Sequence, residues 1–128
     1  MRKELTVTEI TEIENNEWIV FSTASDNKEP HAIVVIPSRV EKDKIILSNI
    51  QMKKSIENIK LNPKCFIDVY IKEQEDKQIK INGIGNIYDS GELFQEIKEF
   101  EETNNLPEDL KVNSIIVIKI SNIEVSEG

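Results

Sequence analysis

The chain has 128 residues, and its 16 lysines and arginines stand against 24 aspartates and glutamates, which gives a formal net charge of −8 at pH 7. This acidity and an aromatic content of only 5% argue against nucleic acid as a partner, because such proteins normally present a basic face or stacking platforms. A single cysteine, Cys65, excludes an internal disulfide and a cysteine-rich zinc site. Because there is also only one histidine, we assign no metal site and no catalytic residue from the sequence.

The length favours one domain over residues 1–128. The first residues lead into an acidic amphipathic segment instead of an apolar signal sequence. No stretch approaches the roughly 20 apolar residues of a membrane span. We therefore expect a soluble, cytoplasmic protein without a membrane partner.

The first half of the chain predicts a short helix followed by strands. Thr6-Val7-Thr8-Glu9 is a capping-box pattern, and the helix that it opens ends at Asn15-Asn16. Runs rich in β-branched and aromatic residues predict strands at 18–24, 31–40 and 44–49. Pro37 should lie at a bulge or a sheet edge, because it cannot donate a hydrogen bond to a strand ladder.

The second half predicts two helices and three further strands. A helix over about 52–61 should bury Met52, Ile56 and Ile59, and Asn62-Pro63 stops it. A later helix begins after Asp89-Ser90-Gly91-Glu92, and its expected apolar stripe consists of Leu93, Phe94, Ile97 and Phe100. The expected strands are 64–72, 78–88 and 112–125, with a bulge near Gly83 and Gly85 in the second of them.

This order of elements predicts a mainly β fold, a closed β-barrel with a few helices. The helices are too few to connect every pair of strands, so the sheet should be mainly antiparallel. Two runs, Ile33–Ile36 and Ile115–Ile118, are apolar on both faces of their strands. The barrel interior covers one face, so a helix or a second subunit must cover the other, and a homodimer is the economical solution.

The helix over 52–61 begins with Lys53, Lys54 and Ser55, directly after a strand that ends at Ser48-Asn49. A helix start collects unpaired backbone N–H groups and the positive end of the macrodipole, so it suits an anion. Lysines at this position destabilise the helix when no ligand is bound, and a bound phosphate would make their electrostatic contribution favourable. The alternative is an ordinary solvated helix start.

Several segments in order resemble the FMN-binding split-barrel, or pyridoxamine 5'-phosphate oxidase-like, family. They are Glu29-Pro30-His31 entering an apolar strand, Leu47-Ser48-Asn49 followed by Met52-Lys53-Lys54-Ser55-x-x-Asn58-Ile59, Asn62-Pro63 before a strand, and 79–87 before an acidic helix. The similarity covers roughly residues 6–125 and is greatest to the small single-domain FMN-binding proteins. It implies a six-stranded antiparallel split barrel that forms a homodimer and holds one FMN per subunit near the dimer interface.

The resemblance also implies which residues hold the cofactor. Lys53, Lys54 and Ser55 match the contacts to the FMN phosphate, and Ser48 and Asn49 match the strand end beside the ribityl chain. The strand beside the flavin ring corresponds to 34–36. The complete set of expected cofactor-binding residues is Val34, Val35, Ile36, Ser48, Asn49, Met52, Lys53, Lys54 and Ser55.

Departures from the family limit the activity that it implies. Pyridoxamine phosphate oxidases hold substrate with a C-terminal arginine and histidine, whereas this chain has no arginine after Arg39 and no histidine except His31. We therefore expect a small redox protein or a flavin-dependent oxidoreductase that acts on a small-molecule partner. The alternatives are a non-catalytic protein that stores or senses flavin or another phosphate ligand, a deazaflavin-dependent reductase, and a scaffold that has lost cofactor binding.

Overall fold

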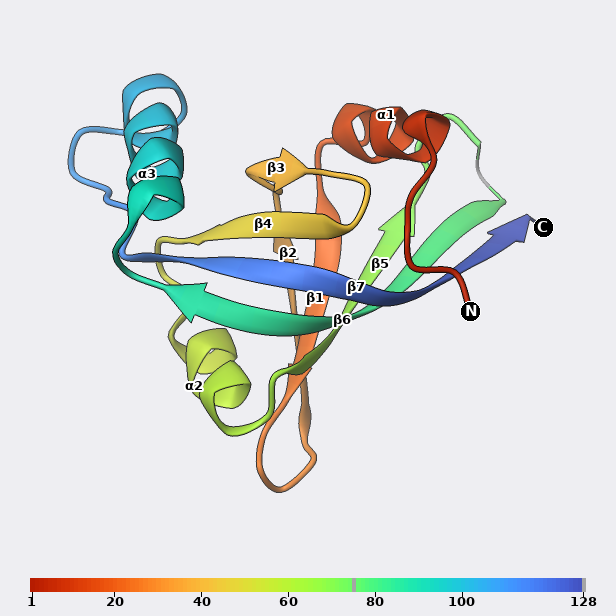
Figure 1. Ribbon diagram of the computed structural model, residues 1–128, viewed down its shortest axis with the longest axis horizontal. Coiled ribbons are helices and arrows are strands. Elements are labelled where there is room, and N and C mark those ends of the chain that lie inside the picture. The colour runs from red at the N-terminus through yellow and green to blue at the C-terminus, as the bar shows by residue number, and fades with distance from the viewer. Residues whose placement is uncertain (75, 128) are drawn as a thin grey trace.

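The computed structural model describes residues 1–74 and 76–127. This part of the chain forms three helices and seven strands (Figure 1). The helices are α1 (Val7–Asn15), α2 (Lys53–Leu61) and α3 (Glu92–Asn104). The strands are β1 (Ile19–Ala24), β2 (Pro30–Val35), β3 (Arg39–Val40), β4 (Lys44–Asn49), β5 (Lys64–Tyr70), β6 (Lys77–Tyr88) and β7 (Ser114–Glu127).

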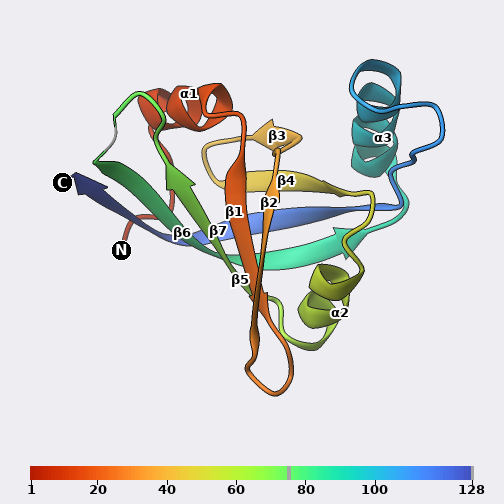
Figure 2. The same cartoon turned by 180° about the vertical axis from the view of Figure 1, so that it is seen from behind.

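The strands form one antiparallel sheet in the order β2-β1-β5-β6-β7-β4-β3. The sheet curves into a half-barrel, which Figures 1 and 2 show from its two sides. The longest ladder joins β6 to β7, and its register shifts between Asn82 and Gly83. The bulge that the glycines of β6 predicted is therefore confirmed.

The expected count of six strands is wrong, because the segment expected as one strand over 31–40 forms two. β2 ends at Val35 and pairs with β1, whereas β3 begins at Arg39 and pairs with β4. Pro37 lies between them, and a proline has no N–H with which to continue a ladder. β2 and β3 lie at opposite ends of the sheet, and no ladder between described strands joins those ends. The barrel is therefore open here, instead of closed.

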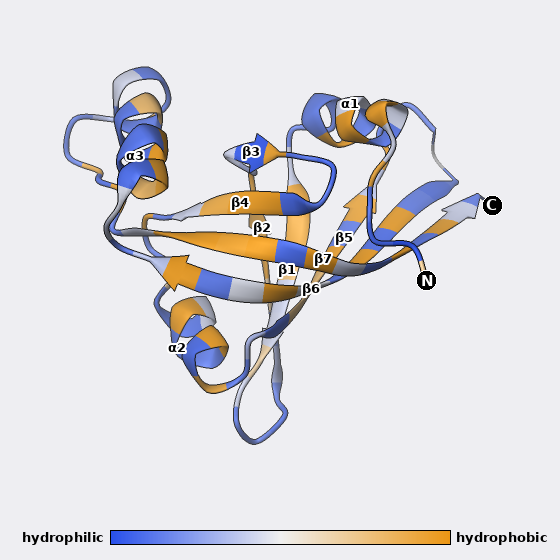
Figure 3. Cartoon of the chain, in the orientation of Figure 1, coloured by the Kyte–Doolittle hydropathy of each residue, from blue (hydrophilic) through white to orange (hydrophobic). Residues whose placement is uncertain are grey.

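The main core lies on the concave side of the sheet, where the inward residues of nearly every strand meet. Figure 3 shows the apolar stretches of β4 and β7 side by side at its centre. The largest fully buried side chains of this core are Ile13, Ile19, Phe21, Ile45, Leu47, Ile67, Ile79, Ile81, Ile116 and Ile118. Cys65 belongs to this core and packs there as a small apolar residue.

The two runs that are apolar on both faces differ in how their outer faces are covered. In β7, Ile116 and Ile118 face the main core, while Ile115 packs with Phe94 and Ile97 of α3 in a second cluster. The outer face of that run is therefore covered by a helix, which is one of the two kinds of cover that the sequence predicted. The run in β2 has no such cover, because Val34 is 65% exposed and Ile36, just beyond the strand, is 73% exposed.

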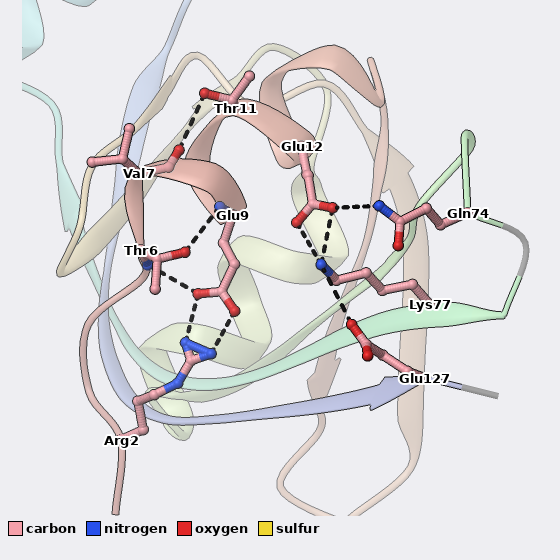
Figure 4. Close-up of polar contacts among 9 residues, drawn as sticks. All are labelled: Arg2, Thr6, Val7, Glu9, Thr11, Glu12, Gln74, Lys77 and Glu127. Carbon is pink, nitrogen blue, oxygen red and sulfur yellow. Dashed lines mark hydrogen bonds and ion pairs between the residues drawn. The ribbon is translucent and has the colours of Figure 1, made fainter.

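The capping box of α1 is confirmed, and the helix is held to the sheet by ion pairs (Figure 4). Thr6 Oγ1 accepts a hydrogen bond from the N–H of Glu9, whose carboxylate also binds Arg2. On the same helix, Glu12 accepts hydrogen bonds of 2.8 and 2.9 Å from Lys77 Nζ at the start of β6. This second pair fixes α1 over the end of the sheet that lies away from α2 and α3 (Figure 1).

The helices depart from the expected apolar stripes at some positions. Phe94 and Ile97 of α3 are buried, but Phe100 is 56% exposed. In α2 Ile59 is buried, while Met52 and Ile56 are half-buried beside the core. Over residues 1–74 and 76–127, no helix combines the length and the apolar character needed to cross a membrane.

Candidate functional site

A groove of about 930 Å³ opens on the side of the molecule where β2 has no further neighbouring strand. It lies between β2, the end of β4 with the turn into α2, and the C-terminal end of α3 (Figure 2). Its lining residues are Trp18, Ile33, Val34, Val35, Ile36, Pro37, Ser48, Ile50, Gln51, Met52, Glu101, Asn105 and Leu106. Pockets for small molecules and cofactors typically measure about 300–1,000 Å³, so this groove can take a cofactor-sized ligand.

The longest wall of the groove is the strand β2 together with Ile36 and Pro37. Side chains alternate across a strand, so Ile33 and Val35 pack toward the core while Val34 projects outward. The other edge of β2 pairs with β1, with Val34 opposite Val20. The result is a flat apolar wall on an edge strand, whose backbone groups are open to a ligand.

The end of β4 supplies a polar floor that is held by internal hydrogen bonds. The hydroxyls of Ser48 and Ser38 share a hydrogen bond of 2.6 Å. Asn49 Oδ1 accepts a hydrogen bond from the N–H of Met52 at 2.9 Å, and its Nδ2 donates to Ser114 Oγ at 2.9 Å. These bonds fix the turn that leads from β4 into α2, so Asn49 positions the helix start.

The start of α2 is positively charged and has no internal partner for that charge. Lys53 and Lys54 are exposed, and neither forms an ion pair with another residue of the described chain. Met52 at the N-cap offers no side-chain acceptor to the first N–H groups of the helix. Ser55, in the same turn, is only 1% exposed, and its Oγ has no hydrogen-bond partner among the residues described. A buried hydroxyl without a hydrogen-bond partner is unfavourable unless a group from outside the chain forms a hydrogen bond with it.

Two contacts hold α2 rigidly against the sheet. Asn58 Nδ2 donates a buried hydrogen bond of 3.0 Å to Thr23 Oγ1 of β1. Ile59 packs over Gly85 of β6, where an added Cβ would lie 3.2 Å from Ile59 Cδ1. A Cβ at position 85 would therefore require Ile59 to shift by a few tenths of an ångström, so the glycine allows α2 to lie close against β6.

Comparison with known proteins finds counterparts for this architecture but not for the sequence. No protein-family model matches the chain, and no curated protein matches it. An FMN-binding protein from Syntrophomonas wolfei is 21% identical and has a TM-score of 0.76, covering 91% of this chain and 82% of that chain. A candidate pyridoxamine 5'-phosphate oxidase from Lactobacillus delbrueckii is 10% identical and also has a TM-score of 0.76, over 96% and 95%. The fold is the FMN-binding split barrel.

HupZ from Group A Streptococcus has the same split barrel, with 15% identity, a TM-score of 0.80, and coverage of 93% of this chain and 92% of that chain. Two further structures with this fold are an F420 reductase and HutZ, a heme storage protein from Vibrio cholerae. At such identities the likeness establishes the fold alone. Because these split barrels differ in their ligands, the ligand has to be argued from this chain's own residues.

The expected cofactor residues of this split barrel fall into two adjoining groups. Val34, Val35, Ile36, Ser48 and Met52 line the groove. The others lie beside it: Asn49 is the last residue of β4, and Lys53, Lys54 and Ser55 form the first turn of α2. The structure therefore places the set at one location, while its role in binding stays a prediction.

Sequence reasoning missed the wall that α3 provides. No motif in the sequence marks Glu101, yet it lines the groove together with Asn105 and Leu106. Trp18, expected in the first strand, precedes β1 and also lines the groove at 41% exposure. The exposure of Trp18 follows from the tertiary structure, so no signal in the sequence marked its place in the groove. No metal-binding cluster of histidine, cysteine or carboxylate side chains occurs within the described ranges.

Proposed function

We propose that this protein binds FMN, with the phosphate at the start of α2 and the isoalloxazine ring in the groove beside β2, and that it functions as a small redox protein or a flavin-dependent oxidoreductase. The observation that carries the proposal is the placement of an unpaired positive helix start directly beside a cofactor-sized apolar groove. Either feature alone is common on protein surfaces. Together they match the two chemically different ends of FMN.

The start of α2 fits a phosphate for three reasons. Lys53 and Lys54 carry positive charge that no described residue neutralises, and they flank N–H groups at the positive end of the helix dipole. The buried hydroxyl of Ser55 lacks a partner in the same turn. A phosphate oxygen can accept hydrogen bonds from such groups, and each such charge-assisted bond typically contributes about 1.5–3 kcal/mol.

The groove fits an isoalloxazine because its long wall is flat and apolar. Val34 and Ile36 are the exposed side chains of this wall and give van der Waals cover to a ring face, and the backbone groups of the edge strand, at Val35 among others, can meet the polar edge of the ring. When bound, FMN supplies the redox chemistry, and the protein supplies binding and orientation. Among the described lining residues there is no histidine, cysteine or lysine, so Glu101 is the side chain of this lining that can act as a general acid or base.

The same lining argues against the other ligands of this fold. Heme iron is held by an axial histidine, cysteine or tyrosine, or by methionine paired with histidine, and of these types only Met52 is among the described residues that line the groove, without a histidine beside it. The deazaflavin cofactor carries a longer anionic tail, whereas the cationic side chains beside the groove form one compact cluster at Lys53 and Lys54. A non-catalytic flavin store or sensor would use the same site, so it is separated from a redox protein by an assay and not by geometry.

We further propose that a second copy of this chain packs along the exposed strip formed by Trp18, Val34 and Ile36 and leaves the groove beside it open to ligand, so that FMN lies near the dimer interface. These side chains are 41%, 65% and 73% exposed, and β2 is an edge strand. An uncovered apolar edge of this kind is a surface for association. The expected outcome is a dimer in light scattering, which Val34→Asp converts to a monomer. A wild-type monomer at micromolar concentration would refute the homodimer.

Cys65 indicates the compartment and not the chemistry. Burial raises the pKa of its thiol to about 12, so the thiol stays protonated and does not take part in thiol redox reactions. A free buried thiol is typical of proteins in reducing compartments. We therefore propose a cytoplasmic location, which a fluorescent fusion expressed in the source cell tests.

The deciding experiment is the visible spectrum of the protein after addition of FMN and dialysis. We expect the wild type to keep a flavin band and Lys53→Ala/Lys54→Ala to lose it. Lys60→Ala is the matched control, because it removes a lysine from the other end of the same helix and should leave binding unchanged. A wild type that does not take up FMN would refute the proposal. Oxidation of reduced nicotinamide by the loaded protein would then separate an oxidoreductase from a store or sensor.

A further inference from the structure

The carboxylate of Glu101 is the only formally charged side chain among the described residues that line the groove. It lies near the C-terminal end of α3, whereas the lysines lie at the start of α2. Figure 2 shows these two helices on opposite sides of the end of β4. The two flanks of the groove therefore differ in the sign of their charge.

Two carboxylates on α3 have cationic partners, but Glu101, like Glu92 and Glu99, has none within the described chain. Glu96 pairs with Arg39, and Glu102 pairs with Lys98. Glu101 Oε1 instead accepts a neutral hydrogen bond of 3.1 Å from Asn105 Nδ2. Its negative charge is therefore not compensated by the protein.

The helix dipole adds to that charge. α3 has no basic residue in its last turn, so the negative end of its dipole is not offset locally. The backbone carbonyl of Glu101 accepts hydrogen bonds of 2.9 Å from the N–H of Asn105 and 3.0 Å from that of Leu106. These bonds fix the turn that presents the carboxylate to the groove.

We propose that the α3 side of the groove binds a flat apolar cation, and that the small-molecule redox partner of the protein belongs to this chemical class. The redox part of this statement rests on the proposed function, whereas the binding part does not. Trp18 and Leu106 supply apolar contact area, and the face of the Trp18 indole also attracts cations. Glu101 supplies the charge complement, while an anionic ligand of the same shape is repelled.

The test uses methylene blue as the cationic probe and 8-anilinonaphthalene-1-sulfonate as an anionic aromatic probe of similar apolar character. Trp18 is the only tryptophan of the chain and lies in the groove, so its fluorescence reports binding directly. The titrations are made on the full chain with and without FMN. Glu101→Gln removes the charge with little change in shape. Glu99→Gln removes the same charge from an exposed position of α3 outside the groove, and so controls for the acidity of the whole protein.

We expect Glu101→Gln to weaken methylene blue binding about three- to tenfold, the effect of one partly exposed charge, and to leave the anionic probe unchanged or bound more tightly. Glu99→Gln should change neither affinity by more than about twofold. Equal effects of the two substitutions would overturn the proposal, as would an equal loss of both probes in Glu101→Gln or no loss at all. If FMN does not bind but the Glu101-dependent affinity persists, the proposed function fails and the cation site stands. If FMN binds but the affinity for methylene blue does not depend on Glu101, the proposed function stands and only the cation site is refuted.

Discussion

The strongest test of the phosphate site is a stability measurement without any ligand. Lys53 and Lys54 occupy the first turn of α2, where positive charge opposes the helix dipole at a cost of about 0.3–1 kcal/mol each. Neither lysine recovers this cost through an ion pair with a described residue. We therefore expect Lys53→Ala/Lys54→Ala to raise the free energy of unfolding of the flavin-free protein by about 0.6–2 kcal/mol, which is roughly 2–8 °C in Tm for a chain of this size.

The assay is thermal unfolding followed by circular dichroism at low ionic strength. Lys60→Ala is the matched control, because Lys60 lies in the last turn, where positive charge is favourable. This variant should be slightly less stable than the wild type, by a few tenths of a kcal/mol. In about 1 M salt the screening length falls to roughly 3 Å, so both differences should shrink.

Saturating FMN should reverse the order of stability. A ligand at 100 times its Kd stabilises the folded state by about 2.7 kcal/mol, and only the wild type is expected to bind it tightly. If the double variant is instead less stable than the wild type without ligand, then the lysines make favourable contacts in the folded chain. The view of α2 as an anion site with an uncompensated charge would then be wrong.

Three further predictions concern single sites. Ser55→Ala should leave the stability of the flavin-free protein unchanged or raise it by up to about 1 kcal/mol, because the lost hydroxyl has no partner, and it should weaken FMN binding in a fluorescence titration. Glu12→Gln should lower the free energy of unfolding in urea by about 1–3 kcal/mol without changing FMN affinity. This magnitude lies between those of surface and buried ion pairs, because Lys77 is only 12% exposed. The hydrogen bond to Glu12 raises the pKa of Lys77, so the wild-type contribution should be fully present below about pH 10.4 and be lost as the pH rises through the higher folded-state pKa. Gly83→Ala should lower Tm and cost at least about 1–3 kcal/mol, because the new Cβ would lie 2.4 Å from Ile118 Cγ2.

The features that could be predicted from sequence are those with local causes. The capping box at Thr6 and Glu9 specifies the start of α1 within one turn, and Asn62-Pro63 stops α2 where expected. The bulge of β6 was visible in its glycines because a missing side chain permits close approach of a neighbouring strand. Each of these signals acts over a few residues, so no knowledge of tertiary structure was needed.

The features that could not be predicted depend on contacts between distant segments. The pattern of α3 gives Glu101 a place on a helix face, but only the packing of α3 against the end of β4 brings that face to the groove. Phe100 fits the apolar stripe equally well and is nevertheless exposed. In the same way, the spacing of Lys53 and Ser48 does not reveal that one lies beside the groove and the other in its floor.

The shape of the site depends most on a residue with no ligand-binding group. Pro37 lies between β2, which pairs with β1, and β3, which pairs with β4. Because the proline interrupts the strand, the chain crosses from one end of the sheet to the other at this point. Ser38 rejoins β4 immediately afterwards, through its N–H to the carbonyl of Ile46 at 2.8 Å. The break leaves Val34 and Ile36 as an uncovered apolar wall that faces the turn into α2. A charged helix start binds anions in general, and this opening in the sheet is the reason that we propose one particular kind of anion, a phosphate linked by a chain to a large flat ring.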